Sequence, residues 1–216
     1  FRRKYKDSVS LGRWAEAKRP RSDLSNSSGA SASNGNTPVW GWNPGKTQFK
    51  KGLEYFREIL PSVDVLILNK EEAEQFTNLK ATKISLEGKE YDQVRCGELI
   101  SVPSQTEISH LWDMREIAKH FLEAGIHTVA ITDGSRGAQI FDSNQHYFSP
   151  CQIGERVDTL GAGDAFSVGL LSARIHGHDL KTQIRWANEN ANKVIHYVGA
   201  QEGQLTLDEM KAIVAG

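Results

Sequence analysis

Two apolar runs constrain the fold of this chain more strongly than any other feature of its sequence. The segments VDVLILN at 63–69 and HTVAIT at 127–132 show almost no polar alternation, which is typical of strands buried on both faces of a sheet. Segments with helical periodicity alternate with these runs along the chain. This alternation predicts an α/β fold, in which a mostly parallel sheet is flanked by helices. Helices are expected at 48–60, 71–79, 114–125, 162–177, 180–199 and from Thr206 onward.

Two of the expected helices carry a clear core-facing stripe. In the segment 48–60, apolar residues recur three or four positions apart, at Phe49, Leu53, Phe56 and Leu60. The segment 180–199 is expected to bury Ile184, Ala187, Ala191, Val194 and Val198. The last helix begins with Thr206 and Glu209, which have the spacing of a capping box. Residues 80–111 are too mixed in character for an assignment.

Composition excludes several classes of function. The chain has 26 basic and 27 acidic residues and a formal net charge of −1, so no global field favours nucleic acid or an anionic membrane, and neither partner is expected. No apolar stretch approaches the length of a membrane span. Cys96 and Cys151 cannot form a disulfide framework, which favours a reducing, cytoplasmic setting.

The amino-terminal segment differs from the rest of the chain. Residues 1–36 are basic at first and then rich in Ser, Asn and Gly, with few aliphatic residues. Such a composition predicts a poorly ordered arm, with a basic nucleic-acid arm as the alternative. The folded part is therefore expected at 37–216. The chain opens on Phe1 rather than Met, which favours its being a fragment.

Polar residues follow three of the expected strands. Asn43 comes after VWGW, Asn69 ends the run at 63–69, and Thr132 ends the run at 127–132. In open α/β sheets, ligands bind beyond the carboxyl ends of the strands. These three side chains are therefore candidates for one ligand site, although Asn and Thr also serve ordinary turns at strand exits.

The stretch VDTLGAGDAF at 157–166 carries the most specific chemistry. Gly161, Ala162 and Gly163 precede a helical pattern, so their N–H groups belong to the unsatisfied donors of a helix start, where an anion is favoured. Asp164 adds a carboxylate that suits a general base, because an alcohol that attacks a phosphate must lose its proton. The alternative is structural: Asp164 interacts with the helix dipole and the glycines allow close packing.

These residues resemble a known family. The segment from Asp158 to Asp164 is similar to D-T-x-G-A-G-D, the carboxyl-terminal signature of the ribokinase-like, or PfkB, carbohydrate kinases. The resemblance extends, with gaps, from about Val39 to about Leu205. It implies transfer of the γ-phosphoryl group of ATP to a hydroxyl of a sugar-type substrate. Asp164 would be the catalytic base, and Gly161, Ala162 and Gly163 would form the anion hole.

Further matches imply the binding residues. NKEE fits the family's N-x-x-E, so that Asn69 and Glu72 are implied near Mg²⁺ and phosphate, usually through water. TDGSRGA fits T-x-G-x-x-G and implies Thr132, Gly134 and Gly137 near the phosphates and ribose. Taken alone, N-x-x-E fits a helix cap equally well, and T-x-G-x-x-G fits a hairpin turn equally well. The strand-end Asn-Pro implies that Asn43 lies near the triphosphate.

The later helix and loop complete the implied site. The segment ANENANKVIHYVGAQ is similar to the family's adenine border, which implies Asn188, Asn192 and Gly199 as nucleotide contacts. In several relatives a monovalent cation such as K⁺ is held by carbonyls at the positions of Asp158 and the Gly199 loop.

The chain departs from the family at its amino terminus. Nothing in residues 1–36 resembles the half that carries the sugar contacts and the β lid. Relatives often form homodimers through that lid, so a dimer has no support here. Two alternatives stay open. The chain is a nucleotide-binding fragment or remnant without catalysis, or GWNPGKT is a phosphate loop, although only three residues separate Gly41 from Gly45 where the motif needs four.

Overall fold

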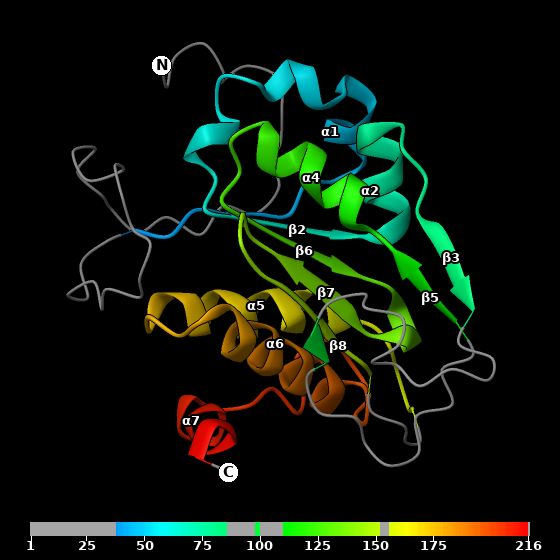
Figure 1. Ribbon diagram of the computed structural model, residues 1–216. Coiled ribbons are helices and arrows are strands. Elements are labelled where there is room, and N and C mark those ends of the chain that lie inside the picture. The colour runs from blue at the N-terminus through cyan, green and yellow to red at the C-terminus, as the bar shows by residue number, and fades with distance from the viewer. Residues whose placement is uncertain (1–37, 86–97, 100–109, 152–155, 216) are drawn as a thin grey trace.

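The computed structural model describes residues 38–85, 98–99, 110–151 and 156–215. The arm expected at 1–36 and Cys96 lie outside these residues. A six-stranded sheet forms the centre of the molecule (Figure 1). Its order is β1 (Gly41–Trp42), β2 (Val65–Asn69), β6 (Thr128–Thr132), β7 (Ala138–Phe141), β8 (His146–Ser149) and β4 (Glu98–Leu99).

The sheet is mixed and mostly parallel. Among the described strands, β1–β2, β2–β6 and β4–β8 pair in parallel, whereas β6–β7 and β7–β8 pair antiparallel. The two apolar runs of the sequence form β2 and β6, which are paired from Val65↔Thr128 to Asn69↔Thr132. The predicted fold class is therefore confirmed.

Helices cover both faces of the sheet (Figure 1). The first face packs against α1 (Lys46–Lys51), α2 (Lys70–Thr77) and α4 (Arg115–Glu123). The second face packs against α5 (Ala162–Ile175) and α6 (Leu180–Val194), and α7 (Leu207–Ala215) lies outside that pair. Strand β2 serves both faces, because Leu66 and Leu68 enter the first core and Val65 and Ile67 enter the second.

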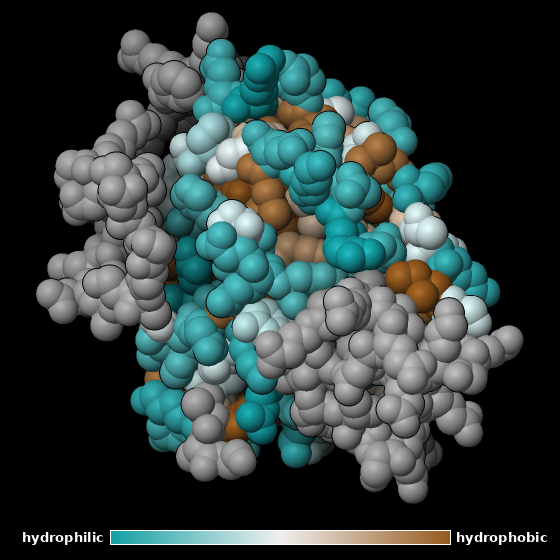
Figure 2. All heavy atoms as spheres, in the orientation of Figure 1, coloured by the Kyte–Doolittle hydropathy of each residue, from teal (hydrophilic) through white to brown (hydrophobic). Residues whose placement is uncertain are grey.

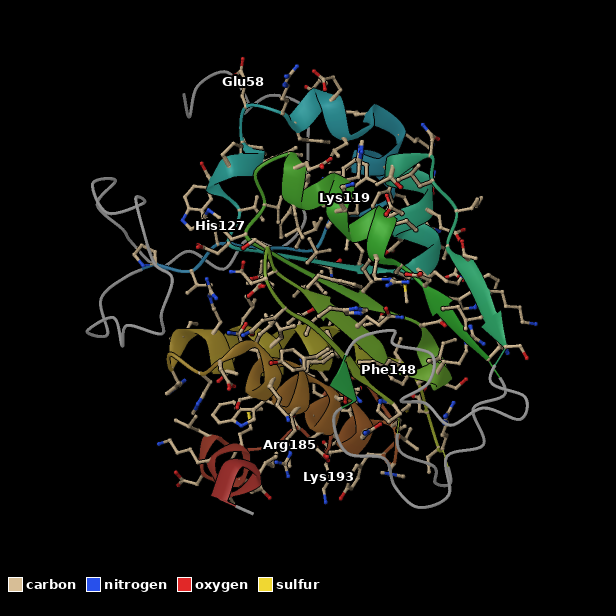
Figure 3. All side chains as sticks on the ribbon, viewed as in Figure 1. Glu58, Lys119, His127, Phe148, Arg185 and Lys193 are labelled. Atoms are coloured by element: carbon tan, nitrogen blue, oxygen red, sulfur yellow. The ribbon has the colours of Figure 1, made fainter. Side chains whose placement is uncertain are left out.

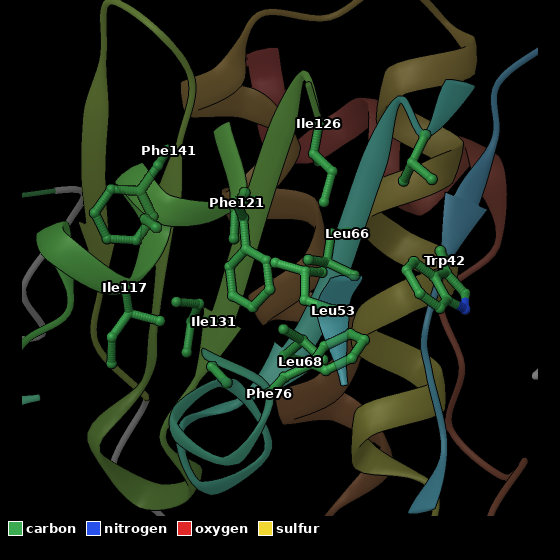
Figure 4. Close-up of a cluster of buried hydrophobic side chains, with 14 of the residues drawn as sticks. Trp42, Leu53, Leu66, Leu68, Phe76, Ile117, Phe121, Ile126, Ile131 and Phe141 are labelled. Carbon is green, nitrogen blue, oxygen red and sulfur yellow. The ribbon is translucent and has the colours of Figure 1, made fainter. Parts of the chain in front are cut away.

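The first core combines aromatic and aliphatic side chains (Figure 4). Trp42 makes edge contacts with Phe56 and Phe76, whose ring centroids lie 5.1 and 5.8 Å from that of Trp42. Figure 2 shows hydrophobic atoms in patches on this side of the molecule, within a largely hydrophilic surface. On the opposite side, Lys193 of α6 projects away from the sheet (Figure 3).

The single helix predicted at 48–60 is wrong. Helix α1 ends at Lys51 because Gly52 adopts φ 73°, where its N–H still bonds to the carbonyl of Phe49. Two short 3₁₀ turns follow, η1 (Leu53–Phe56) and η2 (Leu60–Ser62). The four predicted core residues are nevertheless buried: Phe49, Leu53, Phe56 and Leu60. The periodicity identified the buried side chains but not the break between them.

A second, small sheet occupies part of the unassigned segment. Strands β3 (Thr82–Ser85) and β5 (His110–Asp113) pair antiparallel. The side-chain amide of Gln139 on β7 donates to the carbonyl oxygen of Trp112 on β5 at 2.7 Å. This hydrogen bond joins the small sheet to the central one.

The helix pair α5–α6 is packed closely. A Cβ at Gly169 of α5 would lie 2.7 Å from the carbonyl oxygen of Trp186 on α6. The fully buried Asn190 donates to the carbonyl of Ala165 and accepts from the N–H of Leu205, each at 2.8 Å. The predicted burial of Val198 is wrong, because α6 ends at Val194 and Val198 is 76% exposed on the following loop.

Helix α7 begins as the capping pattern predicts. The hydroxyl of Thr206 accepts from the N–H of Glu209, and the carboxylate of Glu209 accepts from the N–H of Thr206 at 2.8 Å. Among the residues that the structure describes, no helix has both the length and the apolar character that crossing a bilayer requires.

Candidate active site

The predicted site residues come from elements that end at one edge of the sheet. Strands β1, β2 and β6 are parallel, so Asn43, Asn69 and Thr132 follow one another along the edge at their carboxyl ends. Strand β8 runs in the same direction as β6, because both are antiparallel to β7, and it ends there too. Helix α6 reaches this edge, since Cys151, just after β8, donates to the side-chain oxygen of Asn192 at 3.1 Å.

The glycine turn begins α5 at the same edge. Gly161 is the N-cap with φ 83°, and a Cβ there would lie 2.5 Å from the carbonyl oxygen of Ala200. A Cβ at Gly163 would meet nothing within 4 Å. Asp164 follows in the first helical turn and is exposed. One glycine is therefore needed to build the turn, whereas the other faces open space beside a carboxylate.

Asp158 ties this turn to the loop after α6. Its carboxylate accepts from the N–H of Leu160 at 2.9 Å and from the N–H of Gly199 at 3.1 Å. These backbone hydrogen bonds, that of Leu160 foremost, hold the pKa of Asp158 below its ordinary value. The N–H of Val157 also donates to the carbonyl of Ile195 at 2.9 Å. The two segments that the sequence implied around a monovalent cation are thus adjacent, although the cation itself stays a prediction.

Asn69 and Glu72 form a capping box at the start of α2. The side-chain oxygen of Asn69 accepts from the N–H of Glu72 at 2.8 Å, and the carboxylate of Glu72 accepts from the N–H of Asn69 at 3.0 Å. Burial raises the pKa of Glu72 above its ordinary value. The capping interpretation of N-x-x-E is therefore correct as a description of structure. The capping hydrogen bond uses only the Oε2 oxygen of the Glu72 carboxylate, and a role of Asn69 and Glu72 near Mg²⁺ stays a prediction.

The turn after β6 carries the second glycine motif. The N–H of Asp133 donates to the carbonyl of Gly137 at 2.8 Å, and this closes the loop around η3 (Gly134–Arg136). Gly137 has φ 104°, and a Cβ there would lie 2.7 Å from the Cα of Pro150. Gly134 also has positive φ, but a Cβ there would meet no atom within 4 Å.

An ion pair inside this turn was missed by sequence reasoning. The guanidinium of Arg136 donates Nη2–H to the carboxylate of Asp133 at 2.7 Å, and its Nε–H donates to the other carboxylate oxygen. The Asp-x-x-Arg spacing was the available signal, because residues three apart in a helical turn face each other.

The predicted adenine-side asparagines differ in their hydrogen bonding. The amide nitrogen of Asn188 lies 2.8 Å from the hydroxyl of Ser149 and 2.7 Å from the carbonyl of Pro150. Asn192 is buried, and its amide nitrogen has no hydrogen-bond partner among the residues that the structure describes. Asn188 thus fastens α6 to the end of β8, whereas Asn192 keeps a buried donor at the same edge.

The phosphate-loop alternative fits this geometry poorly. The N–H of Gly45 donates to the side chain of Gln48 at 3.0 Å, and Trp42 is fully buried in the aromatic core. The glycine turn of α5 carries the more specific pattern. The model of the pfkB family of carbohydrate kinases matches residues 45–207. The chain belongs to this family.

Curated relatives of this kinase-family chain include sugar kinases and a nucleoside kinase. An uncharacterized sugar kinase of Archaeoglobus fulgidus is 37% identical over 106 residues, which are 48% of this chain and 42% of that protein. Ribokinase of Bacillus subtilis is 32% identical over 85 residues, which are 39% of this chain and 29% of the enzyme. The chain therefore matches less than half the length of these relatives.

Solved structures show the same fold. The nucleoside kinase of Methanocaldococcus jannaschii superimposes with a TM-score of 0.57 at 24% identity, covering 86% of this chain and 50% of that one. Ribokinase II of E. coli, solved with ATP and Mg²⁺, gives a TM-score of 0.56 at 19% identity and covers 82% and 48%. The chain spans about half the length of these kinases.

Proposed function

We propose that this chain supplies the ATP-binding and phosphoryl-transfer machinery of a kinase that acts on a hydroxyl of a sugar or sugar-like substrate. The family of the chain and its likeness to a kinase solved with ATP and Mg²⁺ support this proposal. The observation that carries it is the start of α5, where an exposed carboxylate adjoins a turn whose Gly163 faces open space.

Asp164 is the general base in this proposal. It accepts the proton of the substrate hydroxyl while the hydroxyl oxygen attacks the γ-phosphorus of ATP. The bond from the γ-phosphorus to the bridging oxygen breaks, and ADP leaves with that electron pair. The amides of Gly161 and Gly163 donate to the phosphoryl oxygens, on which charge accumulates. The N–H of Ala162 donates to the carbonyl of Thr159 at 3.3 Å, and it joins this anion hole only when that long hydrogen bond opens.

The remaining residues hold the nucleotide. Asn43, Thr132 and Gly134 line the triphosphate side of the edge, and Gly137 shapes the turn that carries Gly134. Asn188, Asn192 and Gly199 border the base. Bound Mg²⁺ would neutralise phosphate charge, and Asn69 and Glu72 would orient its water ligands. Asp158 and the Gly199 loop are the proposed place for a monovalent cation such as K⁺.

A second candidate function follows from length. The chain spans about half of the solved kinases that it resembles. A nucleotide-binding unit that needs a separate substrate-binding half, and that transfers no phosphate alone, is therefore the alternative.

Two measurements separate these functions. A calorimetric titration of the protein with ATP in the presence of Mg²⁺ tests nucleotide binding. ATP-dependent phosphorylation of ribose, cytidine, inosine and 2-dehydro-3-deoxygluconate tests transfer on substrates of the matched kinases. Binding without transfer supports the second candidate, and no binding refutes both.

The variant Asp164→Asn tests the base. It should keep ATP affinity and lose at least about a hundredfold in turnover. Asp179→Asn is the matched control, because Asp179 caps the far helix of the pair and Asn caps equally well. Unchanged turnover in Asp164→Asn would show that the base lies elsewhere.

A further inference from the structure

The edge that would receive a triphosphate is rich in carboxylates. Glu71 and Asp164 are exposed there, and Glu72 is partly buried. A polyanion beside these groups needs cationic or N–H donors. Lys70 is a poor source, because its ammonium lies 3.1 Å from Glu71 and 4.8 Å from the ring centroid of Trp112. Arg136 is placed differently.

Arg136 is held in a fixed orientation by a buried carboxylate. Asp133 is 7% exposed, and it accepts the Nε–H and one Nη2–H of the guanidinium along a single edge. The backbone fixes the same spacing, since the N–H of Arg136 donates to the carbonyl of Asp133 at 3.1 Å. The hydrogen bond with Asp133 raises the pKa of Arg136 above its ordinary value, so the cation is permanent.

The opposite edge of the guanidinium remains available. Of its five N–H bonds, Asp133 takes two, and the described residues give Arg136 no other hydrogen-bond acceptor. The side chain of Arg136 is 36% exposed although that of Asp133 is buried. The three remaining N–H bonds point away from the Asp133 carboxylate. They belong to the turn that contains Thr132, Gly134 and Gly137.

We infer that Arg136 contacts a phosphate group of the bound nucleotide and that Asp133 is its positioning residue. This inference rests on the proposed function. The ion pair of Asp133 and Arg136 has no net charge. Its contribution to phosphate binding therefore comes from N–H donors that point at the phosphate, and not from a general attraction between a positive protein and a negative ligand. An arginine fork that is held in advance loses little freedom when it binds a phosphate.

This difference gives an unusual expectation for Asp133→Asn. The variant makes the protein more positive by one charge but releases the guanidinium. A positioned fork predicts severalfold weaker binding of ATP, whereas simple attraction predicts tighter binding. Tighter or unchanged binding of ATP by a folded Asp133→Asn protein would overturn the positioning role.

The main test uses the double variant Asp133→Asn/Arg136→Gln. Removing both charges avoids leaving a buried carboxylate unpaired, which would itself destabilise the protein. Affinities for ATP, adenosine and inorganic tripolyphosphate are measured by competition with a fluorescent ATP analogue or by calorimetry, and thermal melts check folding. We expect about ten- to hundredfold weaker binding of ATP and tripolyphosphate, with adenosine unchanged.

The outcomes distinguish this inference from the proposed function. Normal affinity of the variant for tripolyphosphate, or an equal loss for ATP and adenosine, overturns the phosphate contact while the kinase proposal stands. A wild-type protein that binds neither ATP nor tripolyphosphate refutes both. Lys46→Ala is the control, because no carboxylate among the described residues forms an ion pair with this exposed cation after β1, and the variant should change ATP affinity less than threefold.

Discussion

The two glycine motifs at the sheet edge share one arrangement and differ in their support. Each has a glycine pressed against another segment, Gly137 against Pro150 and Gly161 against Ala200. Each also has a glycine that faces open space, Gly134 and Gly163. In both turns, therefore, one glycine is required by the fold and the other leaves room in front of the backbone.

The supports of the two turns are different in kind. The turn at 132–137 rests on the end of β8 and contains an ion pair, so it belongs to the sheet. The turn at 158–163 rests on the loop after α6 and is held by backbone hydrogen bonds to Asp158. Exposed apolar side chains surround the second turn, with Leu160 64% and Val198 76% exposed. From this comparison we infer that the first turn has its conformation before any ligand binds, whereas the conformation of the second turn depends on the position of the loop after α6.

The variant Gly137→Val should have the largest effect. Its Cβ would lie 2.7 Å from the Cα of Pro150 and 2.8 Å from the backbone nitrogen of Cys151, at φ 104°. Neither strand end can move without disturbing the sheet, so we expect a loss of about 4 kcal/mol or more in the free energy of unfolding. Urea denaturation followed by circular dichroism measures this. Gly134→Ala, with positive φ but open space, should cost only about 1–2 kcal/mol. Equal costs would remove the distinction between packed and open glycines.

Gly161→Ala should be the next most damaging change. The new Cβ would lie 2.5 Å from the carbonyl oxygen of Ala200, and φ is 83°. The loop that carries Ala200 can shift where β8 cannot, so we expect about 2–4 kcal/mol, less than for Gly137→Val. The same denaturation experiment tests the order of the two variants. A larger loss for Gly161→Ala would mean that the loop is as rigid as the strand.

The parts of the fold that sequence could predict were those with a local cause. The apolar runs of β2 and β6 indicate strands because both of their faces are buried. The glycine spacing at 161–163 indicates a helix start. The three polar strand ends indicate an edge because parallel strands share a direction. Each of these inferences needs only a short segment of chain.

The parts that could not be predicted depend on distant contacts. The pairing of β3 with β5 joins Thr82 to Asp113, which are far apart in sequence. The break at Gly52 competes with a helical pattern that continues beyond it. The exposure of Val198 follows from where α6 ends. The close contact that restricts position 161 to glycine comes from Ala200, which the motif itself does not contain.

Gly163→Val should affect turnover and not stability, in contrast to the variants at the packed glycines. Since a Cβ there meets no atom within 4 Å, the free energy of unfolding should change by less than about 1 kcal/mol. Turnover should fall by about 10²–10³, or about 3–4 kcal/mol, because the side chain would occupy the place of the phosphoryl oxygens. Denaturation and the phosphorylation assay give the two values. Normal turnover in a folded variant would refute the anion hole.

The last prediction concerns β8, which supports the first turn and not the second. At its other end, His146 stacks on Phe141 and bonds through Nε2 to the side-chain oxygen of Gln139 at 3.0 Å. Because the nitrogen of Gln139 donates to Trp112, that oxygen must accept, which places the proton of the neutral imidazole on Nε2.

Burial lowers the pKa of His146 from 6.5 to about 4. Above pH 6.5 His146 is neutral in both the folded and the unfolded protein, and its effect on stability is then least unfavourable. Between pH 6.5 and about 4 the unfolded chain binds a proton that the folded chain refuses, so about 3 kcal/mol of stability is lost across that window. Urea denaturation at several pH values should show this slope in the wild type and a shallower one in His146→Gln. The exposed His196→Gln is the control for the substitution itself. If His146→Gln kept the wild-type slope, the acid sensitivity would come from another group.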